Sequence, residues 1–171
     1  PTPVRLQDIA TAWLGSRGRT GQWGDGTVKH AENPECIERS KEFAESGGAW
    51  RRQNHDEGEL KNINGVVGGL VVGRANPYVA PATEPELYVN FLATDRRSGR
   101  KGIGALLLEK ARALAREMGV GVLRLDCYAG NGGGLVRYYE PQGFERGESF
   151  EVTGWPGLIM VRRLDKEGEG R

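Results

Sequence analysis

The sequence predicts a single α/β domain, with a mixed sheet of about six or seven strands flanked by about four helices. Two observations carry this prediction. Residues 63–72, 86–94 and 122–128 are apolar runs rich in β-branched side chains, with the length of strands buried on both faces. The run at 86–94 passes through a basic, glycine-rich turn directly into a segment with an apolar stripe at helical spacing.

The other elements follow from apolar spacing and from residues that begin or end helices. Pro34 begins a helix, with Asn33 as its cap, and Gly47 ends it. Pro141 stops a short helix, and a final hairpin turns around Gly154. We expect further strands at residues 1–5, 50–54, 144–153 and 158–164, helices at 6–14, 34–46, 103–118 and 135–140, and a polar turn at 55–58.

The length of 171 residues allows one domain with a sizeable core. We place this domain at residues 1–164 and expect the charged, glycine-rich tail at 165–171 to be flexible. A net charge of +1 argues against an extended nucleic-acid or acidic-membrane surface.

Two cysteines, Cys36 and Cys127, lie far apart and have no metal-ligand spacing around them. We therefore expect reduced thiols and no bound metal. No apolar run approaches the roughly 18 residues of a membrane span, and the first residues lack a signal-peptide pattern. These observations predict a cytoplasmic protein with no membrane partner.

The loop before residue 103 has the features of a phosphate or pyrophosphate site. Gly99, Gly102 and Gly104 leave backbone N–H groups accessible at the start of a helix, whose dipole favours an anion. The Gly-Lys-Ser/Thr ending of a P-loop is missing, and so is the full dinucleotide fingerprint. The basic side chains around the turn are Arg96, Arg97, Arg100 and Lys101.

This loop and the later segment 131–144, NGGGLVRYYEPQGF, together resemble the GNAT acetyltransferase superfamily. The family's pyrophosphate loop reads Gln/Arg-x-x-Gly-x-Gly/Ala, and its late helix reads Asn…Tyr-x-x-x-Gly-Phe. Gly102 and Gly104 match the small positions, while Gly99 holds the Gln/Arg position with Arg100 as the nearest replacement. The late motif is matched by Asn131, Tyr139, Gly143 and Phe144.

The resemblance implies that an acyl-CoA, most simply acetyl-CoA, is the co-substrate and that no metal is needed. Backbone groups of one strand would bind the pantetheine arm and polarise the thioester carbonyl, here at Phe91, Leu92, Ala93 and Thr94. Pyrophosphate contacts would come from Gly99, Arg100, Lys101, Gly102, Ile103, Gly104 and Ala105, and further cofactor contacts from Asn131 and Tyr138.

The resemblance assigns Tyr139 as general acid for the departing thiolate. Tyr138 is the alternative, because Asn131 lies one residue further from Tyr139 than in the family pattern. Glu86 is the candidate base, acting through a water, although a glutamate at a strand start is more often simply solvated. Cys127 allows an acyl-enzyme route, but no histidine is placed to activate it, so we expect direct transfer in a ternary complex.

Four residues are candidate contacts for the acceptor. Tyr88 and Asn90 share one face of their strand, and Tyr88 holds a position at which some family members keep a glutamate. Asp126 is suited to grip a cationic substrate. Trp23, in a glycine-rich loop, is either a pocket wall or a side chain that packs the loop onto the core.

These observations predict an N-acetyltransferase that acts on the amine of a small molecule. One alternative is a GNAT-fold aminoacyltransferase of specialised metabolism, whose donor is aminoacyl-tRNA; only then do we expect tRNA as a partner. A second alternative is a non-catalytic acyl-CoA-binding module, in which Tyr139 is dispensable. We expect a monomer, or a homodimer through the exposed edge of the last hairpin.

Overall fold

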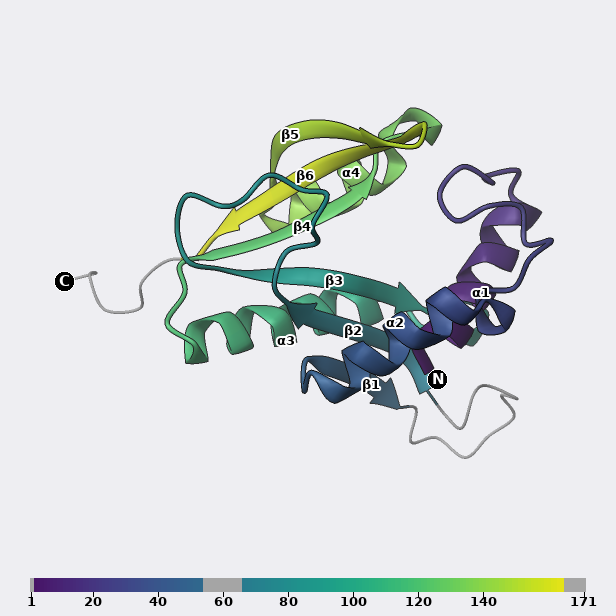
Figure 1. Ribbon diagram of the computed structural model, residues 1–171, viewed down its shortest axis with the longest axis horizontal. Coiled ribbons are helices and arrows are strands. Elements are labelled where there is room, and N and C mark those ends of the chain that lie inside the picture. The colour runs from purple at the N-terminus through teal and green to yellow at the C-terminus, as the bar shows by residue number, and fades with distance from the viewer. Residues whose placement is uncertain (1, 54–65, 165–171) are drawn as a thin grey trace. The chain divides into compact units, whose positions relative to one another are not determined.

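The computed structural model describes residues 2–53 and 66–164. The predicted turn at 55–58, the start of the predicted strand at 63–65 and the tail at 165–171 lie outside the described residues. The helices are α1 (Thr2–Ser16), α2 (Pro34–Glu45), α3 (Ile103–Glu117) and α4 (Gly134–Tyr139) (Figure 1). The strands are β1 (Ala49–Gln53), β2 (Val66–Gly73), β3 (Glu86–Thr94), β4 (Val122–Tyr128), β5 (Glu145–Val152) and β6 (Trp155–Arg163).

The strands form a mixed sheet in the order β1-β2-β3-β4-β6-β5, which confirms the predicted class. β3 and β4 are parallel, whereas β6 pairs antiparallel with both β4 and β5. The described β3–β4 register ends with Val89 opposite Leu125. Asn90 and Asp126 are therefore the first residues of the two strands beyond it.

The described chain forms two compact units, and the first contains Pro1–Val71 and Phe91–Leu108. Leu6, Val66 and Ala93 form a buried cluster within this unit. Gly68 of β2 marks a close approach of α3, because a Cβ at this position would lie 2.8 Å from Ile103 Cγ2. A side chain of any size at position 68 would thus push the helix away from the strand.

The second unit contains Val72–Asn90 and Glu109–Arg171. Val79, Tyr88 and Ile159 form its buried cluster, with Phe150 packed against them. Side chains alternate along a strand, so Asp126 and Cys127 point to opposite faces of β4. Helix α4 packs on β4 and β6 in this unit.

Two predicted elements differ from the structure. Residues 1–5 were expected as a strand, but α1 already begins at Thr2, and a proline in the first helical turn is compatible with this because its missing N–H needs no partner there. The final hairpin turns at Thr153 and Gly154, whose φ values of 50° and 79° suit a two-residue turn. Trp155 to Gly157 consequently belong to β6 and pair with β5.

Candidate active site

Asp95 organises the start of the glycine loop in the first unit. Its carboxylate caps the short 3-10 turn Arg96–Ser98 by accepting the backbone N–H of Arg97 at 2.9 Å. The same carboxylate accepts Nε and Nη2 of the Arg97 guanidinium at 2.9 and 2.8 Å. Since the Asp95 side chain is only 1% exposed, the Arg97 charge compensates a buried carboxylate and is committed to the structure of the loop.

Arg96 is held by an aromatic ring. Its guanidinium carbon lies 4.9 Å from the ring centroid of Trp13, and that of Arg17 lies 5.3 Å from the same centroid. Such cation–π contacts fix the direction of a basic side chain. Two of the four predicted phosphate-binding cations, Arg96 and Arg97, therefore have partners inside the first unit.

The remaining part of the loop keeps the geometry of an anion site. Gly99 and Gly102 have φ values of 64° and 81°, which L side chains rarely adopt. Gly102 directly precedes α3, and Arg100 and Lys101 before it are exposed. The first helical residues are Ile103 and Gly104, both buried, and Ala105, which is half-buried. A helix N-terminus thus lies next to two exposed basic residues, as a pyrophosphate site requires.

Trp23 stacks on Phe91 within the first unit. The ring centroids are 6.5 Å apart and the ring planes differ by 12°. Both side chains pack against the cluster of Leu6, Val66 and Ala93. This contact gives Trp23 a packing role, while its contact with substrate stays a prediction. Leu92 and Thr94 of the predicted pantetheine strand are half-buried.

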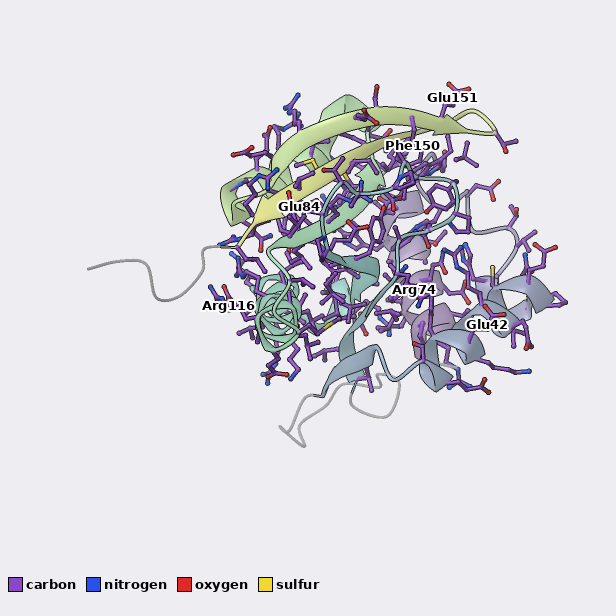
Figure 2. The ribbon with its side chains drawn as sticks, turned by 60° about the vertical axis from the view of Figure 1, so that its left-hand side comes forward. Glu42, Arg74, Glu84, Arg116, Phe150 and Glu151 are labelled. Carbon is purple, nitrogen blue, oxygen red and sulfur yellow. The ribbon has the colours of Figure 1, made fainter. Side chains whose placement is uncertain are left out.

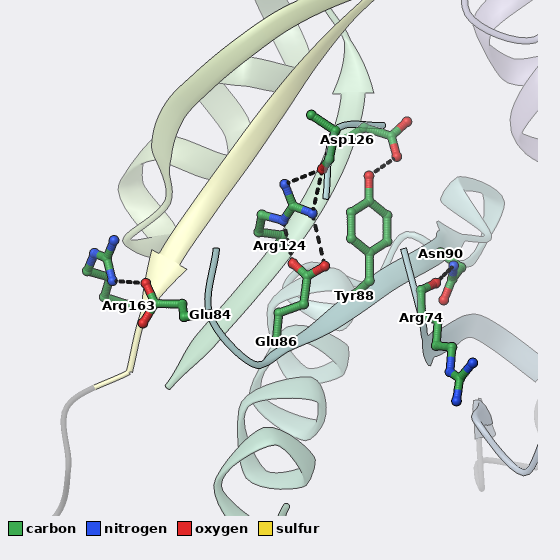
Figure 3. A network of polar contacts seen from close by, with 9 residues as sticks. Arg74, Glu84, Glu86, Tyr88, Asn90, Arg124, Asp126 and Arg163 are labelled. Atoms are coloured by element: carbon green, nitrogen blue, oxygen red, sulfur yellow. Dashed lines mark hydrogen bonds and ion pairs between the residues drawn. The ribbon is translucent and has the colours of Figure 1, made fainter. Parts of the chain in front are cut away.

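Asp126 accepts several hydrogen bonds in the second unit, and Figure 3 shows the one from Tyr88. One carboxylate oxygen accepts the hydroxyl of Tyr88 and, at 3.5 Å, Nδ2 of Asn76. The other accepts the hydroxyl of Tyr78 at 3.4 Å. Asn76 also accepts Nδ2 of Asn90 at 3.3 Å. The network therefore brings together Tyr88, Asn90 and Asp126, three of the predicted substrate residues.

Tyr88 is fully buried beneath this network, with 0% of its surface exposed. Burial and the hydrogen bond to Asp126 hold the pKa of the Tyr88 phenol above its ordinary value. The hydroxyl consequently keeps its proton at neutral pH and acts as a donor to the carboxylate. Asn90 is anchored from its other side by the Arg74 carbonyl, which accepts its Nδ2 at 2.8 Å.

Glu86, the predicted base, is held by Arg124 (Figure 3). The guanidinium donates Nε to one carboxylate oxygen and Nη2 to the other, the latter at 2.9 Å. The side chains of Arg124 and Glu86 are only 10% and 14% exposed. A carboxylate bound in this two-pronged way is poorly suited to accept a proton from substrate, so the geometry favours a structural role.

Tyr139 is a buried residue of α4, with 7% of its surface exposed. Its ring packs edge-on against Phe144 at 5.7 Å and against Tyr138 at 5.1 Å between centroids. Burial, and then the neighbouring Cys127 and Tyr138, raise the pKa of the Tyr139 phenol. Tyr138 is 37% exposed. Of the two tyrosines, Tyr139 has the surroundings of a buried proton donor.

Cys127 is buried on β4, and burial, followed by the Asp126 charge, raises the pKa of its thiol to about 12. A thiol that holds its proton is a poor nucleophile, which agrees with direct transfer. Asn131 is exposed immediately before α4 and has a φ of 54°, a conformation that asparagine tolerates. Within residues 2–53 and 66–164, no cluster of three His, Cys, Asp or Glu side chains is arranged to hold a metal.

Three residues of the network were not predicted as functional: Asn76, Tyr78 and Arg124. Arg124 carried a detectable signal, because an arginine in the buried strand Val122–Tyr128, which is apolar apart from Arg124 and Asp126, requires a partner. Asn76 and Tyr78 carried none. They come from a proline-rich connection about fifty residues before Asp126, and only the folded chain brings them together.

Comparisons with known proteins place this fold. The model of the acetyltransferase (GNAT) family matches residues 26–144. A GNAT-family acetyltransferase structure from Listeria monocytogenes is 20% identical, with a TM-score of 0.63 over 95% of this chain and 89% of that chain. A ribosomal-protein-alanine N-acetyltransferase from Brucella melitensis is 21% identical, with a TM-score of 0.62 over 96% and 93%.

The structure of the NatC complex bound to Gag peptide and CoA contains a further similar chain, 16% identical, with a TM-score of 0.59 over 75% of this chain and 80% of that one. A comparison with curated proteins finds no match. At these identities the solved structures establish the fold alone.

The mixed sheet, the glycine loop before α3 and the short helix α4 agree with the match to the family of N-acetyltransferases. The match over residues 26–144 covers more than half of the sequence, and the chain belongs to the acetyltransferase (GNAT) family. The predicted family and enzyme class are thereby confirmed. In the described parts of the chain, no helix has the length and apolar character of a membrane span.

Proposed function

We propose that the protein transfers an acetyl group from acetyl-CoA to the amine of a small molecule, directly and within a ternary complex. The observation that carries this proposal is Tyr139, a buried and protonated phenol at the position of the family's motif tyrosine. Family membership supports the reaction class, and the anion geometry of Gly99 and Gly102 supports the donor.

The first unit supplies the proposed donor contacts. N–H groups at the start of α3, with Arg100 and Lys101, would hold the pyrophosphate of CoA. The backbone of Phe91, Leu92, Ala93 and Thr94 would bind the pantetheine arm and stabilise charge on the thioester oxygen. Arg96 and Arg97 contribute indirectly, since their partners Trp13 and Asp95 fix the shape of the loop.

The second unit supplies the proposed proton donor. Acetyl-CoA provides the acetyl group, so that a carbon–nitrogen bond to the amine forms as the carbon–sulfur bond breaks. Tyr139 gives its proton to the departing sulfur, and the acceptor nitrogen releases one proton in exchange. Tyr139 is suited to this step because its raised pKa keeps it protonated until the thiolate develops.

A small-molecule acceptor is favoured by the acidic network of the second unit. Asp126 offers a half-buried carboxylate among aromatic and amide side chains, which is the kind of surface that takes a compact cation. The net charge of +1 disfavours the alternative tRNA donor, because an extended RNA contact requires a larger basic surface.

Calorimetric titration of the full chain with acetyl-CoA, desulfo-CoA and aminoacylated tRNA tests the donor, and thiol release with a panel of amines tests turnover. We expect acetyl-CoA to bind in the micromolar range, desulfo-CoA to compete with it, and CoA thiol to appear only with an amine. Salt-sensitive tRNA binding without CoA binding would favour the aminoacyl donor. CoA binding without turnover on any amine would favour the non-catalytic module.

A further inference from the structure

We propose that Asp126 and a row of four aromatic rings beside it bind the acceptor as an arylalkylammonium, that is, a primary amine on a short chain that ends in an aromatic ring. This inference rests on the proposed function, because it assigns the acceptor class of the same reaction. Its evidence is the position of Asp126, the neutral character of the partners of its carboxylate, and the order of the rings.

Asp126 carries the carboxylate that we assign to the acceptor nitrogen. It is the first residue of β4 beyond the described pairing with β3, and it is half-buried.

The hydrogen-bond donors on Asp126 are all neutral in the part of the chain that the structure describes. They are the phenols of Tyr88 and Tyr78 and the amide of Asn76. The contacts from Asn76 and Tyr78 are long, at 3.5 and 3.4 Å, whereas a carboxylate offers about four acceptor positions. The N–H groups of an ammonium would fill these positions at closer range and supply the missing positive charge.

The guanidinium of Arg124 does not cancel this charge. The guanidinium carbon of Arg124 lies 5.7 Å from the ring centroid of Tyr88. Its Nε and Nη2 groups, however, donate to the carboxylate of Glu86. The charges of Arg124 and Glu86 offset each other, and Asp126 remains as a net negative charge. The face of the sheet around Asp126 therefore attracts a cation.

A continuous row of rings begins at this carboxylate. Tyr78, whose hydroxyl reaches Asp126, has its ring centroid 5.7 Å from that of Phe150. Phe150 lies 6.2 Å from Trp155, and Trp155 lies 5.6 Å from Tyr128. Tyr78 is 43% exposed, and the other three rings are half-buried. Successive ring planes are tilted by 33°, 44° and 42°. The row thus combines a negative end with an aromatic surface made of tilted rings.

Two of these rings pack directly against glycine residues, at positions that a larger residue would obstruct. A Cβ at Gly157, directly opposite Phe150 in the hairpin, would overlap the Phe150 ring. A Cβ at Gly130 would overlap the Tyr128 ring in the same way. Because both rings lie on bare backbone, they present their surfaces as a platform, on which an aromatic body stacks while its ammonium reaches Asp126.

Binding of 2-phenylethylamine to the full chain without any acyl donor tests the proposal, because no transfer takes place. Calorimetry should show tighter binding of 2-phenylethylamine than of neutral 2-phenylethanol or of ethylamine, which lacks the ring. Asp126→Asn should weaken 2-phenylethylamine about 10- to 100-fold, the loss of a charge-assisted hydrogen bond, and leave 2-phenylethanol unchanged. Phe150→Leu should weaken 2-phenylethylamine but not ethylamine.

Glu151→Gln is the matched control, because it also removes one negative charge from the second unit (Figure 2). Glu151 is exposed and adjacent to Phe150 on β5, and its side chain points to the other face. We expect this variant to bind 2-phenylethylamine as the wild type does. If Asp126→Asn does not fold, the comparison of ligands on the wild type and on Phe150→Leu decides the question.

Equal affinity for 2-phenylethylamine and 2-phenylethanol, or equal loss in Asp126→Asn and Glu151→Gln, would overturn the proposal. Efficient acetylation of peptide N-termini with no binding of 2-phenylethylamine would overturn it as well, because the acceptor would then be a polypeptide. Failure of the proposed function has a different signature, since acetyl-CoA would not bind even where the amine does.

Discussion

Arg124 of β4 and Glu86 of β3 form a buried two-pronged ion pair between neighbouring parallel strands. In the register Arg124 lies opposite Tyr88, two residues after Glu86. Arg124 also donates two hydrogen bonds, both at 3.1 Å, to the carbonyl of Ala80. The arginine thereby ties the connection before β3 to the sheet. A residue predicted as a catalytic base is thus part of a structural clamp.

Glu86→Gln should therefore lower stability. Removing the negative partner leaves the buried Arg124 charge uncompensated, a loss that costs about 3–5 kcal/mol in the free energy of unfolding. Chemical denaturation monitored by tryptophan fluorescence measures it. The matched control is Glu84→Gln, which breaks the exposed pair with Arg163 and should leave the midpoint unchanged. A general base makes kcat rise with pH to a plateau. If Glu86→Gln is as stable as the wild type but its kcat no longer reaches this plateau at alkaline pH, Glu86 is the base.

Tyr139→Phe should lower kcat about 100- to 10,000-fold, the usual contribution of a general acid, with little change in KM for acetyl-CoA. Stopped assays of CoA thiol release measure both constants. Tyr138→Phe is the matched control, because it removes the same hydroxyl from the adjacent, exposed ring. We expect it to retain wild-type kcat. The reverse result would assign the acid role to Tyr138.

The pH profile provides a second test of Tyr139. Its folded pKa is raised above the ordinary value near 10, so the phenol stays protonated throughout the neutral and mildly alkaline range. No decrease in kcat attributable to loss of this proton is expected below about pH 10. The stability that this shift contributes is fully present at neutral pH and is lost as the pH rises above the pKa of the unfolded chain. A decrease in kcat near pH 8, absent from Tyr139→Phe, would contradict this assignment.

Cys127 should resist alkylation in the folded protein. With a pKa of about 12, its thiol is almost entirely protonated at pH 8, and it is only 4% exposed. Peptide mapping after iodoacetamide treatment should find Cys127 unmodified, but modified once the protein is denatured. Incubation with acetyl-CoA and no amine should leave no acetyl adduct on Cys127. Such an adduct would establish an acyl-enzyme route instead of direct transfer.

Local patterns predicted the elements that depend on local interactions. The apolar run of β3, the left-handed glycines Gly99 and Gly102, and the stripe of α3 are adjacent in the sequence, and the structure places each as expected. The partners of Arg96 and Arg97 were not predicted. Trp13, the partner of Arg96, lies far from it in the sequence, in α1. Nothing in the sequence marks Asp95, the partner of Arg97, as buried.

In the polar network, too, the contacts between residues distant in the sequence were not predicted. Alternation along β3 placed Tyr88 and Asn90 on one face, because strand geometry fixes which residues share a face. The structure connects both with Asp126, and the substrate role of the three stays a prediction. Tyr78 was not predicted, because its place depends on how a proline-rich connection crosses the sheet. The ion pair between Glu86 and Arg124 was not predicted either, because it depends on the register of two strands.

Gly68→Ala should destabilise the first unit, because the added methyl group would lie 2.8 Å from Ile103 Cγ2 and 3.0 Å from Leu107 Cδ1. Both atoms belong to buried side chains at the start of α3, so relief requires a shift of the helix, and such overpacking costs about 1–3 kcal/mol. Gly121→Ala is the control, since its Cβ would meet no atom within 4 Å. Denaturation midpoints compare the two variants.

Gly68→Ala should also weaken acetyl-CoA binding, because the displaced segment begins directly after the glycine loop at Gly102. Calorimetry should give a raised Kd for acetyl-CoA in Gly68→Ala and a wild-type Kd in Gly121→Ala. If Gly68→Ala loses stability but binds acetyl-CoA normally, the start of α3 does not hold the pyrophosphate. The contact between α3 and β2 would then serve packing alone, and the donor site would have to be sought elsewhere in the chain.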